Sequence, residues 1–364
     1  MSSKPRAHRP ASQRGLSIIE LMVGIVVSLL VGLAATQSAI MFTATQRQSV
    51  GTGGVAVNTA TVMSAVKDDL ALAGLGFFGS STYLCDRLNL SVNGAIQVNG
   101  ASFSPLQVTR LATGDTIDAV YGTRVEAGAN LLLEAPSAGL DATLRSYLPT
   151  APGQAVLLAP AAPGPTAAPC LVRTVSTNTA STATTPQQLV FSAVGANNRH
   201  NGGGFVNNPG FAKSDRIAVL GDLRWTRYRV VSGNLVVERP LDGTSATLVR
   251  NVIAFRVQYG VAPATLPGNP LNTTLEQWVD PTGTFAAVNG TTLPRIRAMR
   301  IGLIVRSPQM EKADPSTGVC AATDTKPTLF GLPAENLANA DWNCYRYRTT
   351  TVVVPLRNVV MGLR

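Results

Sequence analysis

Few residues of the types that perform catalysis are arranged for such chemistry in this sequence. The 364 residues include two histidines: His8 lies in a basic N-terminal segment, and His200 lies in the polar stretch 198–202, where we expect a solvated loop residue. Ser64 and Lys67 have Ser-x-x-Lys spacing, but they lie in a helical pattern that we expect to serve packing. Because an activated nucleophile usually needs a base beside it, the sequence predicts no catalytic residue and no enzyme.

A glycine pattern in residues 74–79 has the spacing of a dinucleotide-binding loop, which would hold a pyrophosphate at the start of a helix. Its sequence, Gly-Leu-Gly-Phe-Phe-Gly, matches G-x-G-x-x-G. That fingerprint needs a strand before it and a helix after it. Here a helical pattern precedes the glycines and a Ser/Thr-containing stretch follows them, so we expect a turn that ends a helix, and no cofactor.

The N-terminus carries a basic segment followed by an apolar one. Residues 1–15 hold four of the chain's 30 Lys and Arg residues and no acid, so part of the net charge of +10 belongs to this segment. Residues 16–35 are almost entirely apolar, and as a helix of about 30 Å they match the hydrocarbon core of a bilayer. The positive flank predicts that residues 1–15 stay in the cytoplasm and that everything after the span lies outside.

Glu20 stands near the start of this apolar segment, where an ordinary export signal does not need it. A secretory signal cut near residues 32–35 and a plain membrane anchor are the two simplest interpretations. Neither explains a carboxylate whose placement deep in lipid costs about 2.5–3.5 kcal/mol, and such a residue usually has a partner.

The residues around Glu20 resemble the signal of the type IV prepilin superfamily, in which Arg14-Gly15 is followed by an apolar start, here LSIIELM. The resemblance implies that a prepilin peptidase cuts between Gly15 and Leu16, that the new amine of Leu16 is N-methylated, and that the apolar helix is retained. It also implies that Glu20 pairs with the terminal amine of a neighbouring subunit. Such a pair offsets the desolvation of the carboxylate and sets the register of subunits during assembly.

The membrane topology bears on the four cysteines, Cys85, Cys170, Cys320 and Cys344. They lack C-x-x-C spacing and a nearby histidine, which argues against a metal site and against thioredoxin-like chemistry. Outside the cytoplasm, cysteines are expected to pair. Of three pairings we favour Cys320–Cys344, which closes a compact C-terminal loop, together with Cys85–Cys170, which ties the end of the helix to a loop tract. Free buried thiols are the alternative for the second pair.

The elements that must position these residues follow from the hydrophobic pattern. Gly51, Gly53 and Gly54 are expected to interrupt or loosen the helix. A packing stripe then recurs from residue 55 to about 75, and Asp69 falls off it. Strands and a hairpin are expected later, at 116–121, 155–158, 188–192, 216–220, 223–231 with 235–239, 252–259, 295–305 and 345–355.

Three tracts between these strands have the composition of loops. They are residues 159–187, 195–212 and 261–293, which are rich in Ala, Pro, Thr, Gly or Asn or lack periodicity. Such tracts bury little apolar surface, so we expect them outside the core.

Several later segments resemble the narrower family of PilW-type minor pilins: residues 69–74, 251–260, 296–307 and 345–358. The resemblance implies an α+β, pilin-like fold, in which a long N-terminal helix packs on a mainly antiparallel β-sheet domain. It divides the chain into a leader at 1–15, a helix at 16–75 whose transmembrane half spans about 16–42, and a periplasmic, β-rich globular domain at 76–364.

The same resemblance implies a structural function. The protein would be a minor pilin that joins a priming complex at the pilus tip and promotes type IV pilus assembly, with twitching motility or adhesion as the outcome. Its partners would be prepilin peptidase, other minor pilins, the major pilin, the assembly platform and membrane lipid. It would reside in the inner membrane as a single-pass protein and then in the pilus.

Two other functions remain as alternatives. A pseudopilin of a type II secretion system would have the same leader and anchor. A membrane-anchored DNA-binding or adhesin module is the other, because basic and aromatic residues interleave at 224–229 and 345–348 and could stack bases and contact phosphates. An ordinary half-buried sheet whose Arg heads reach solvent is favoured for these segments, so nucleic acid is a disfavoured partner.

Overall fold

The structure is a computed structural model, which describes residues 17–79, 82–124, 130–263, 274–314, 316–337 and 340–361. Of residues 40–41, 43–58, 130 and 361 it describes the backbone alone. The chain divides into two compact units, Met1–Gly54 and Val55–Arg364. The leader 1–15 and the new terminus expected at Leu16 lie outside the described residues.

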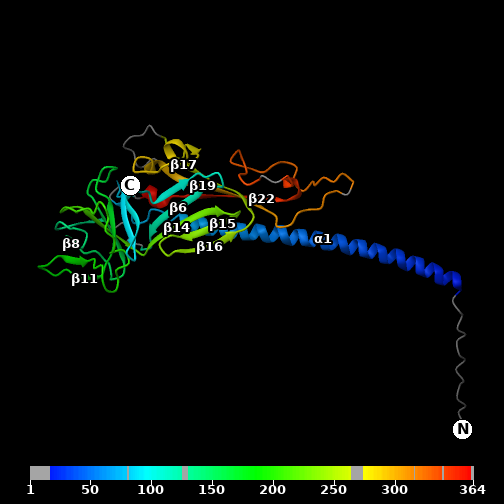
Figure 1. The fold of residues 1–364 in the computed structure, drawn as a ribbon, viewed down its shortest axis with the longest axis horizontal. Coiled ribbons are helices and arrows are strands. Elements are labelled where there is room, and N and C mark those ends of the chain that lie inside the picture. The colour runs from blue at the N-terminus through cyan, green and yellow to red at the C-terminus, as the bar shows by residue number, and fades with distance from the viewer. Residues whose placement is uncertain are drawn as a thin grey trace, which may run out of the picture. The chain divides into compact units, whose positions relative to one another are not determined.

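Helix α1 runs without a break from Ile18 to Leu70 (Figure 1). The interruption expected at Gly51, Gly53 and Gly54 is therefore wrong for the backbone. A glycine in a helix interior costs only about 1 kcal/mol relative to alanine, and longer helical runs on both sides outweigh that cost. The end of the helix, expected near residue 75, lies at Leu70.

The segment after α1 confirms the turn expected from the glycine pattern. Residues 71–76 form consecutive turns, and Gly74 and Gly76 have φ values of +83° and +91°. Only glycine adopts this conformation without strain. The short strand β1 (Phe78–Gly79) follows instead of a helix, so the arrangement does not match a dinucleotide-binding loop.

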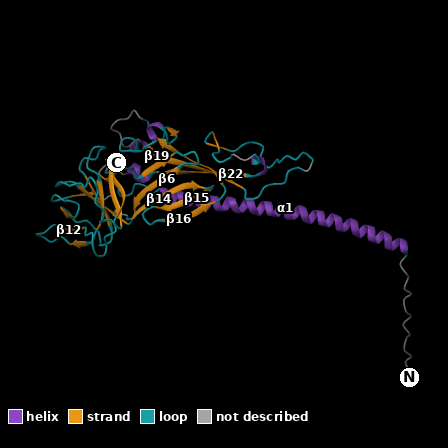
Figure 2. Cartoon of the chain, viewed as in Figure 1, coloured by secondary structure: helices purple, strands orange, loops and turns teal. Residues whose placement is uncertain are grey.

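Beyond α1 the chain is built mainly of strands joined by loops and turns (Figure 2). In spatial order, the six-stranded sheet is β4 (Ala95–Ser102), β3 (Arg87–Val92), β10 (Cys170–Thr174), β9 (Ala155–Ala159), β13 (Arg216–Gly221) and β7 (Asn130–Leu132). The five-stranded sheet is β16 (Thr244–Val249), β15 (Asn234–Arg239), β14 (Leu223–Val231), β6 (Thr116–Gly122) and β5 (Leu106–Thr109).

The four-stranded sheet is β18 (Gln277–Val279), β17 (Val252–Val261), β19 (Ile296–Arg306) and β22 (Tyr347–Pro355). The three-stranded sheet is β11 (Thr177–Thr179), β12 (Gln187–Val190) and β8 (Asp141–Leu144). The remaining elements are short: β2 (Thr82–Tyr83, paired with β1), β20 (Thr328–Leu329), β21 (Leu332–Pro333), α2 (Arg357–Met361) and 3₁₀ turns at Gly283–Phe285, Leu293–Arg295 and Trp342–Cys344.

Among the described strand pairs only β10–β3 is parallel. This confirms the expected fold class, in which an N-terminal helix is followed in the chain by mainly antiparallel sheets.

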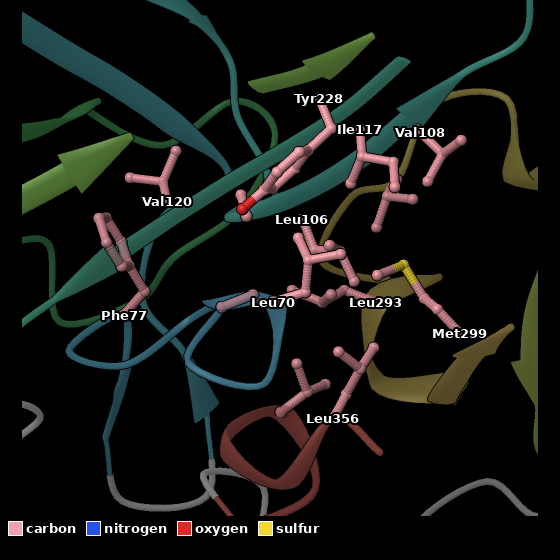
Figure 3. Close-up of a cluster of buried hydrophobic side chains, with 14 of the residues drawn as sticks. Leu70, Phe77, Leu106, Val108, Ile117, Val120, Tyr228, Leu293, Met299 and Leu356 are labelled. Carbon is pink, nitrogen blue, oxygen red and sulfur yellow. The ribbon is translucent and has the colours of Figure 1, made fainter. Parts of the chain in front are cut away.

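The main core lies between the end of α1 and these sheets. Thr59, Met63, Val66 and Leu70 are buried, and their spacing of four, three and four residues places them on one face of the helix. Figure 3 shows Leu70 among side chains from the five- and four-stranded sheets. The amphipathic stripe expected after residue 55 therefore does pack against sheet.

A second hydrophobic core is formed by residues between Leu133 and Val219. This part of the chain connects β6 to β14, which are neighbouring strands of the five-stranded sheet. Strand β9 is buried on both faces: Leu157 faces the main core, and Val156 and Leu158 face the second core. The expectation that 159–187, 195–212 and 261–293 lie outside the core is wrong in part, because Leu171, Phe211 and Phe285 are buried there. Composition averaged over a long tract hides the few apolar residues that a sheet recruits.

Candidate functional site: the stem, its carboxylate and its anchoring to the sheet

Within the described residues, one helical segment is both long enough and apolar enough to cross a membrane: Ile18–Ala39, the first part of α1. Its 22 residues are exposed in the isolated chain. The hydroxyls of Ser28, Thr36 and Ser38 donate to helix carbonyls three or four residues earlier, at 2.7–2.9 Å. These three hydroxyl groups thus find their hydrogen-bond acceptors within the helix, as a lipid environment requires.

Glu20 and Ser17 form a reciprocal cap at the start of α1. The Ser17 hydroxyl accepts from the Ile19 N–H at 3.3 Å, and Glu20 Oε2 accepts from the Ser17 N–H at 3.2 Å. This is the capping box of a helix that begins S-x-x-E. In the isolated chain the carboxylate therefore lies at the N-terminus of the helix.

Both favoured disulfides are present. Sγ atoms of Cys85 and Cys170 are 2.00 Å apart, and those of Cys320 and Cys344 are 2.05 Å apart. The first bond joins the segment after α1 to β10, a central strand and not a loop tract. Its two Cα atoms lie 5.6 Å apart because β3, next to Cys85 in sequence, pairs directly with β10.

The last turn of α1 is tied to the five-stranded sheet by Asp69. Its carboxylate accepts a short hydrogen bond from the Tyr121 hydroxyl and one of 2.7 Å from the Tyr228 hydroxyl. Burial, and after it the Asp69 carboxylate, raises the pKa of Tyr121 to about 12; the same causes raise the pKa of Tyr228. The spacing of the apolar residues in this part of the chain predicts that Asp69 lies off the packed face, so the contact with the two tyrosines was not expected from the sequence.

Beside Asp69 lies a groove of about 460 Å³ between α1 and the sheet. Val62 of α1 and Leu72, just after the end of α1, form one wall, and Val237 and Leu248 of the sheet form the other. The groove lets water approach the carboxylate, so the two tyrosine bonds lie at the border of the core.

The interleaved basic and aromatic strip on β14 is largely paired with acids. Arg227 Nε lies 2.8 Å from Asp118 Oδ1, which also accepts from the Trp225 indole at 2.7 Å. Arg229 binds the Glu238 carboxylate. Since these guanidinium groups already have carboxylate partners, the geometry agrees better with an ordinary half-buried sheet than with a phosphate-binding surface.

His200 is buried and not solvated, which corrects the sequence-based expectation. It is 3% exposed, and its Nδ1 lies 2.7 Å from the Ser91 carbonyl oxygen. Burial lowers the pKa of His200, and the cationic Arg199 and Arg173 add to that effect. The loop 195–212 folds back over β3, so a polar sequence context did not mean exposure. In the described part of the chain, no group of three or more His, Cys, Asp or Glu residues is arranged to hold a metal ion.

A search of curated proteins finds no match. A search of solved structures finds a type IV-like pilin from Thermus thermophilus, with 12% identity and a TM-score of 0.34 over 84% of this chain and 96% of that chain.

The model of the PilW family, described as type IV pilus-assembly protein W, matches residues 225–358, which begin within β14 and include the four-stranded sheet. The matched range contains three of the segments that resembled PilW-type proteins in the sequence: 251–260, 296–307 and 345–358. Over residues 225–358 the chain is therefore similar to the PilW family of type IV pilus-assembly proteins.

Proposed function

We propose that this protein is a minor pilin that takes part in type IV pilus assembly, in a priming complex at the pilus tip. The observation that carries the proposal is the position of Glu20, a single carboxylate in the first turn of an exposed apolar segment of 22 residues. The family match over 225–358 supports it, because it concerns the globular part of the same chain.

In this proposal prepilin peptidase removes residues 1–15 and leaves an N-methylated amine on Leu16. The segment 16–42 anchors the protein in the inner membrane, and the globular domain lies in the periplasm. During assembly Glu20 exchanges its bond with the Ser17 N–H for an ion pair with the terminal amine of a neighbouring subunit. The groups lie in lipid, where an unpaired carboxylate is costly, so the exchange favours one axial register. The partners are other minor pilins, the major pilin and the assembly platform.

The capping box makes a discriminating experiment available. Glutamine at position 20 still accepts from the Ser17 N–H, since Glu and Gln both serve in a capping box, but it carries no charge. We expect Glu20→Gln and Glu20→Ala to lower the number of surface pili to a similar extent, by about tenfold or more, because a lost ion pair in a low-dielectric site costs well above 1.4 kcal/mol.

Membrane levels of each variant, measured by immunoblot, serve as the control for folding and insertion. Normal piliation of Glu20→Gln beside a loss in Glu20→Ala would mean that Glu20 acts only as a helix cap. Mass spectrometry of the protein from cells tests the leader separately: a mature chain that begins at N-methylated Leu16 is expected, and a chain that begins beyond residue 32 would contradict the proposal.

A further inference from the structure

The four-stranded sheet ends on one side in β22, whose outer edge is open. Strand β22 pairs with β19 over all nine of its residues without a register shift. At its two ends, Ser307 N–H donates to the Arg346 carbonyl at 2.8 Å and Leu356 N–H donates to the Arg297 carbonyl at 3.0 Å. Even-numbered residues of this segment therefore bond toward β19.

Because hydrogen bonding alternates along an antiparallel strand, the odd-numbered residues Thr349, Thr351 and Val353 direct their N–H and C=O groups away from β19. In the described part of the chain nothing bonds to these groups. All three side chains are exposed, and Val353 is 47% exposed. This is a row of unsatisfied strand positions that points into solvent.

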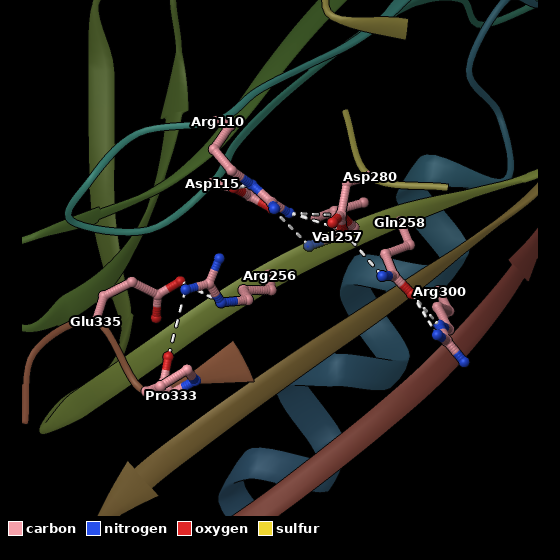
Figure 4. A network of polar contacts seen from close by, with 9 residues as sticks. All are labelled: Arg110, Asp115, Arg256, Val257, Gln258, Asp280, Arg300, Pro333 and Glu335. Carbon is pink, nitrogen blue, oxygen red and sulfur yellow. Dashed lines mark hydrogen bonds and ion pairs between the residues drawn. The ribbon is translucent and has the colours of Figure 1, made fainter. Parts of the chain in front are cut away.

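The opposite edge of the same sheet is capped, which shows that an open edge is not the rule in this fold. On β17 the Ile253 carbonyl accepts from Asn336 N–H at 3.0 Å. The buried Asp115 caps the next positions: its N–H donates to the Phe255 carbonyl at 2.8 Å, and its carboxylate accepts from Val257 N–H at 2.7 Å and from Arg110 (Figure 4). Strand β18 then pairs with the remainder of β17.

The segment just before β22 is covered by the chain itself. The loop held by Cys320–Cys344 lies along it: Ala322 N–H donates to the Asn343 carbonyl at 3.0 Å, and the Thr323 hydroxyl donates to the Tyr345 carbonyl at 2.6 Å. This cover ends before β22 begins. The exposed part of the β17 edge and the segment before β22 therefore have hydrogen-bond partners within the described residues, whereas the edge of β22 around Thr351 has none.

The open segment is also free of the devices that usually prevent strand addition. From Thr349 to Leu356 the sequence is TTTVVVPL, without a charge, and its Pro lies at the end of the strand. Native proteins normally blunt a long edge with Lys, internal Pro or a bulge. An uncharged, β-branched edge of this kind fits the recognition mode in which a partner adds an extended strand.

We propose that the β22 edge binds an extended, uncharged segment of a different subunit of the same assembly, which adds a fifth strand to this sheet. This inference rests on the proposed function, because it assumes that all subunits enter the filament from the same membrane and therefore point in the same direction. An antiparallel pair of two β22 strands would reverse one copy against the other. A parallel, in-register pair of copies would place Arg348 beside Arg348, and like charges directly opposite are unfavourable.

The test uses the full-length chain in piliated cells, with a photo-cross-linking residue at Thr349 or at Val353. The matched control carries it at Val206, which is 83% exposed and lies on a loop far from this sheet in sequence. We expect both edge positions to cross-link to one extended segment of another pilus subunit, at residues about four apart, because strand partners advance in step. Cross-links to a second copy of this chain, to residues at helical spacing, or at no higher yield than from Val206 would overturn the proposal.

A second arm uses the backbone. Thr351→Pro removes an outward N–H and leaves the bonds to β19 in place, so it should lower the cross-link yield at Thr349 by about tenfold or more. Thr351→Ala keeps the N–H and should stay within about twofold of wild type. Thr351→Lys adds an edge charge and should act like Thr351→Pro, which guards against a folding defect in the proline variant. Equal yields in all three variants would overturn the proposal.

The outcome for Glu20→Gln separates the two hypotheses. If Glu20→Gln pili are lost and the edge variants cross-link normally, only the β22 inference fails. If Glu20→Gln cells are normally piliated, the role of the Glu20 charge in the proposed function fails, whatever the cross-links show.

Discussion

The Asp69 contacts predict a large loss of stability from one substitution at the border of the core. Asp69→Ala leaves the Tyr121 and Tyr228 hydroxyls without their carboxylate, and both side chains are less than a tenth exposed, at 7% and 5%. A hydrogen bond to a charged group contributes about 1.5–3 kcal/mol. Water that enters the groove can replace part of this, so we expect a loss of about 3 kcal/mol in the free energy of unfolding, near the low end for two bonds.

The assay is unfolding of the full-length chain by urea in detergent, and tryptophan fluorescence monitors the transition. The chain's three tryptophans, Trp225, Trp278 and Trp342, all lie in the unit Val55–Arg364, so the signal reports that unit and not the apolar segment. Asp68→Ala is the matched control, because Asp68 is exposed on the same turn of α1 and should change stability by no more than about 0.5 kcal/mol.

Tyrosine variants divide the effect between the two bonds. Tyr121→Phe and Tyr228→Phe should each cost about 1–2 kcal/mol, and each should cost much less in an Asp69→Ala background, since the shared acceptor is already gone. The reasoning is refuted if Asp69→Ala is no more destabilising than Asp68→Ala, or if the tyrosine effects are unchanged when Asp69 is absent.

Two further predictions concern the disulfides and pH. Replacing both members of the pair Cys85–Cys170 by Ser should lower the free energy of unfolding by about 1 kcal/mol more than replacing Cys320–Cys344. The reason is that the two bonds close loops of 85 and 24 residues, for which the chain-entropy model gives about 4.6 and 3.5 kcal/mol. Equal losses in the urea assay would contradict this prediction. His200 has a lowered pKa in the folded state, so its contribution to stability is complete above the unfolded value of about 6.5 and is lost as the pH falls below it, by at most about 1.4 kcal/mol per pH unit. His200→Gln should reduce this slope in urea titrations between about pH 7 and 5, and an unchanged slope would show that another group causes it.

Expectations that depended on local pattern succeeded for the long elements. The hairpin 223–231 with 235–239, the strand 252–259 and the strand 295–305 appear within one or two residues of their expected bounds, because their alternation and turn residues are strong. The capping box of Ser17 and Glu20 could also have been read from S-x-x-E spacing, but the family resemblance drew attention to the charge of Glu20 alone. The short strands, such as β10 inside 159–187, were missed because three to five residues show no clear period.

By itself, the sequence determined where the apolar segment starts and ends, where its one carboxylate stands, and that the rest of the chain forms mainly strands. These follow from runs and periods of neighbouring residues, which the backbone geometry of helices and strands makes local properties. Only the tertiary structure decided that Asp69 meets two tyrosines, that His200 is buried, and that β22 keeps an open edge while Asp115 caps the other. Those are contacts between residues up to 159 positions apart in the chain, and they depend on how the sheets pair, which no local pattern encodes.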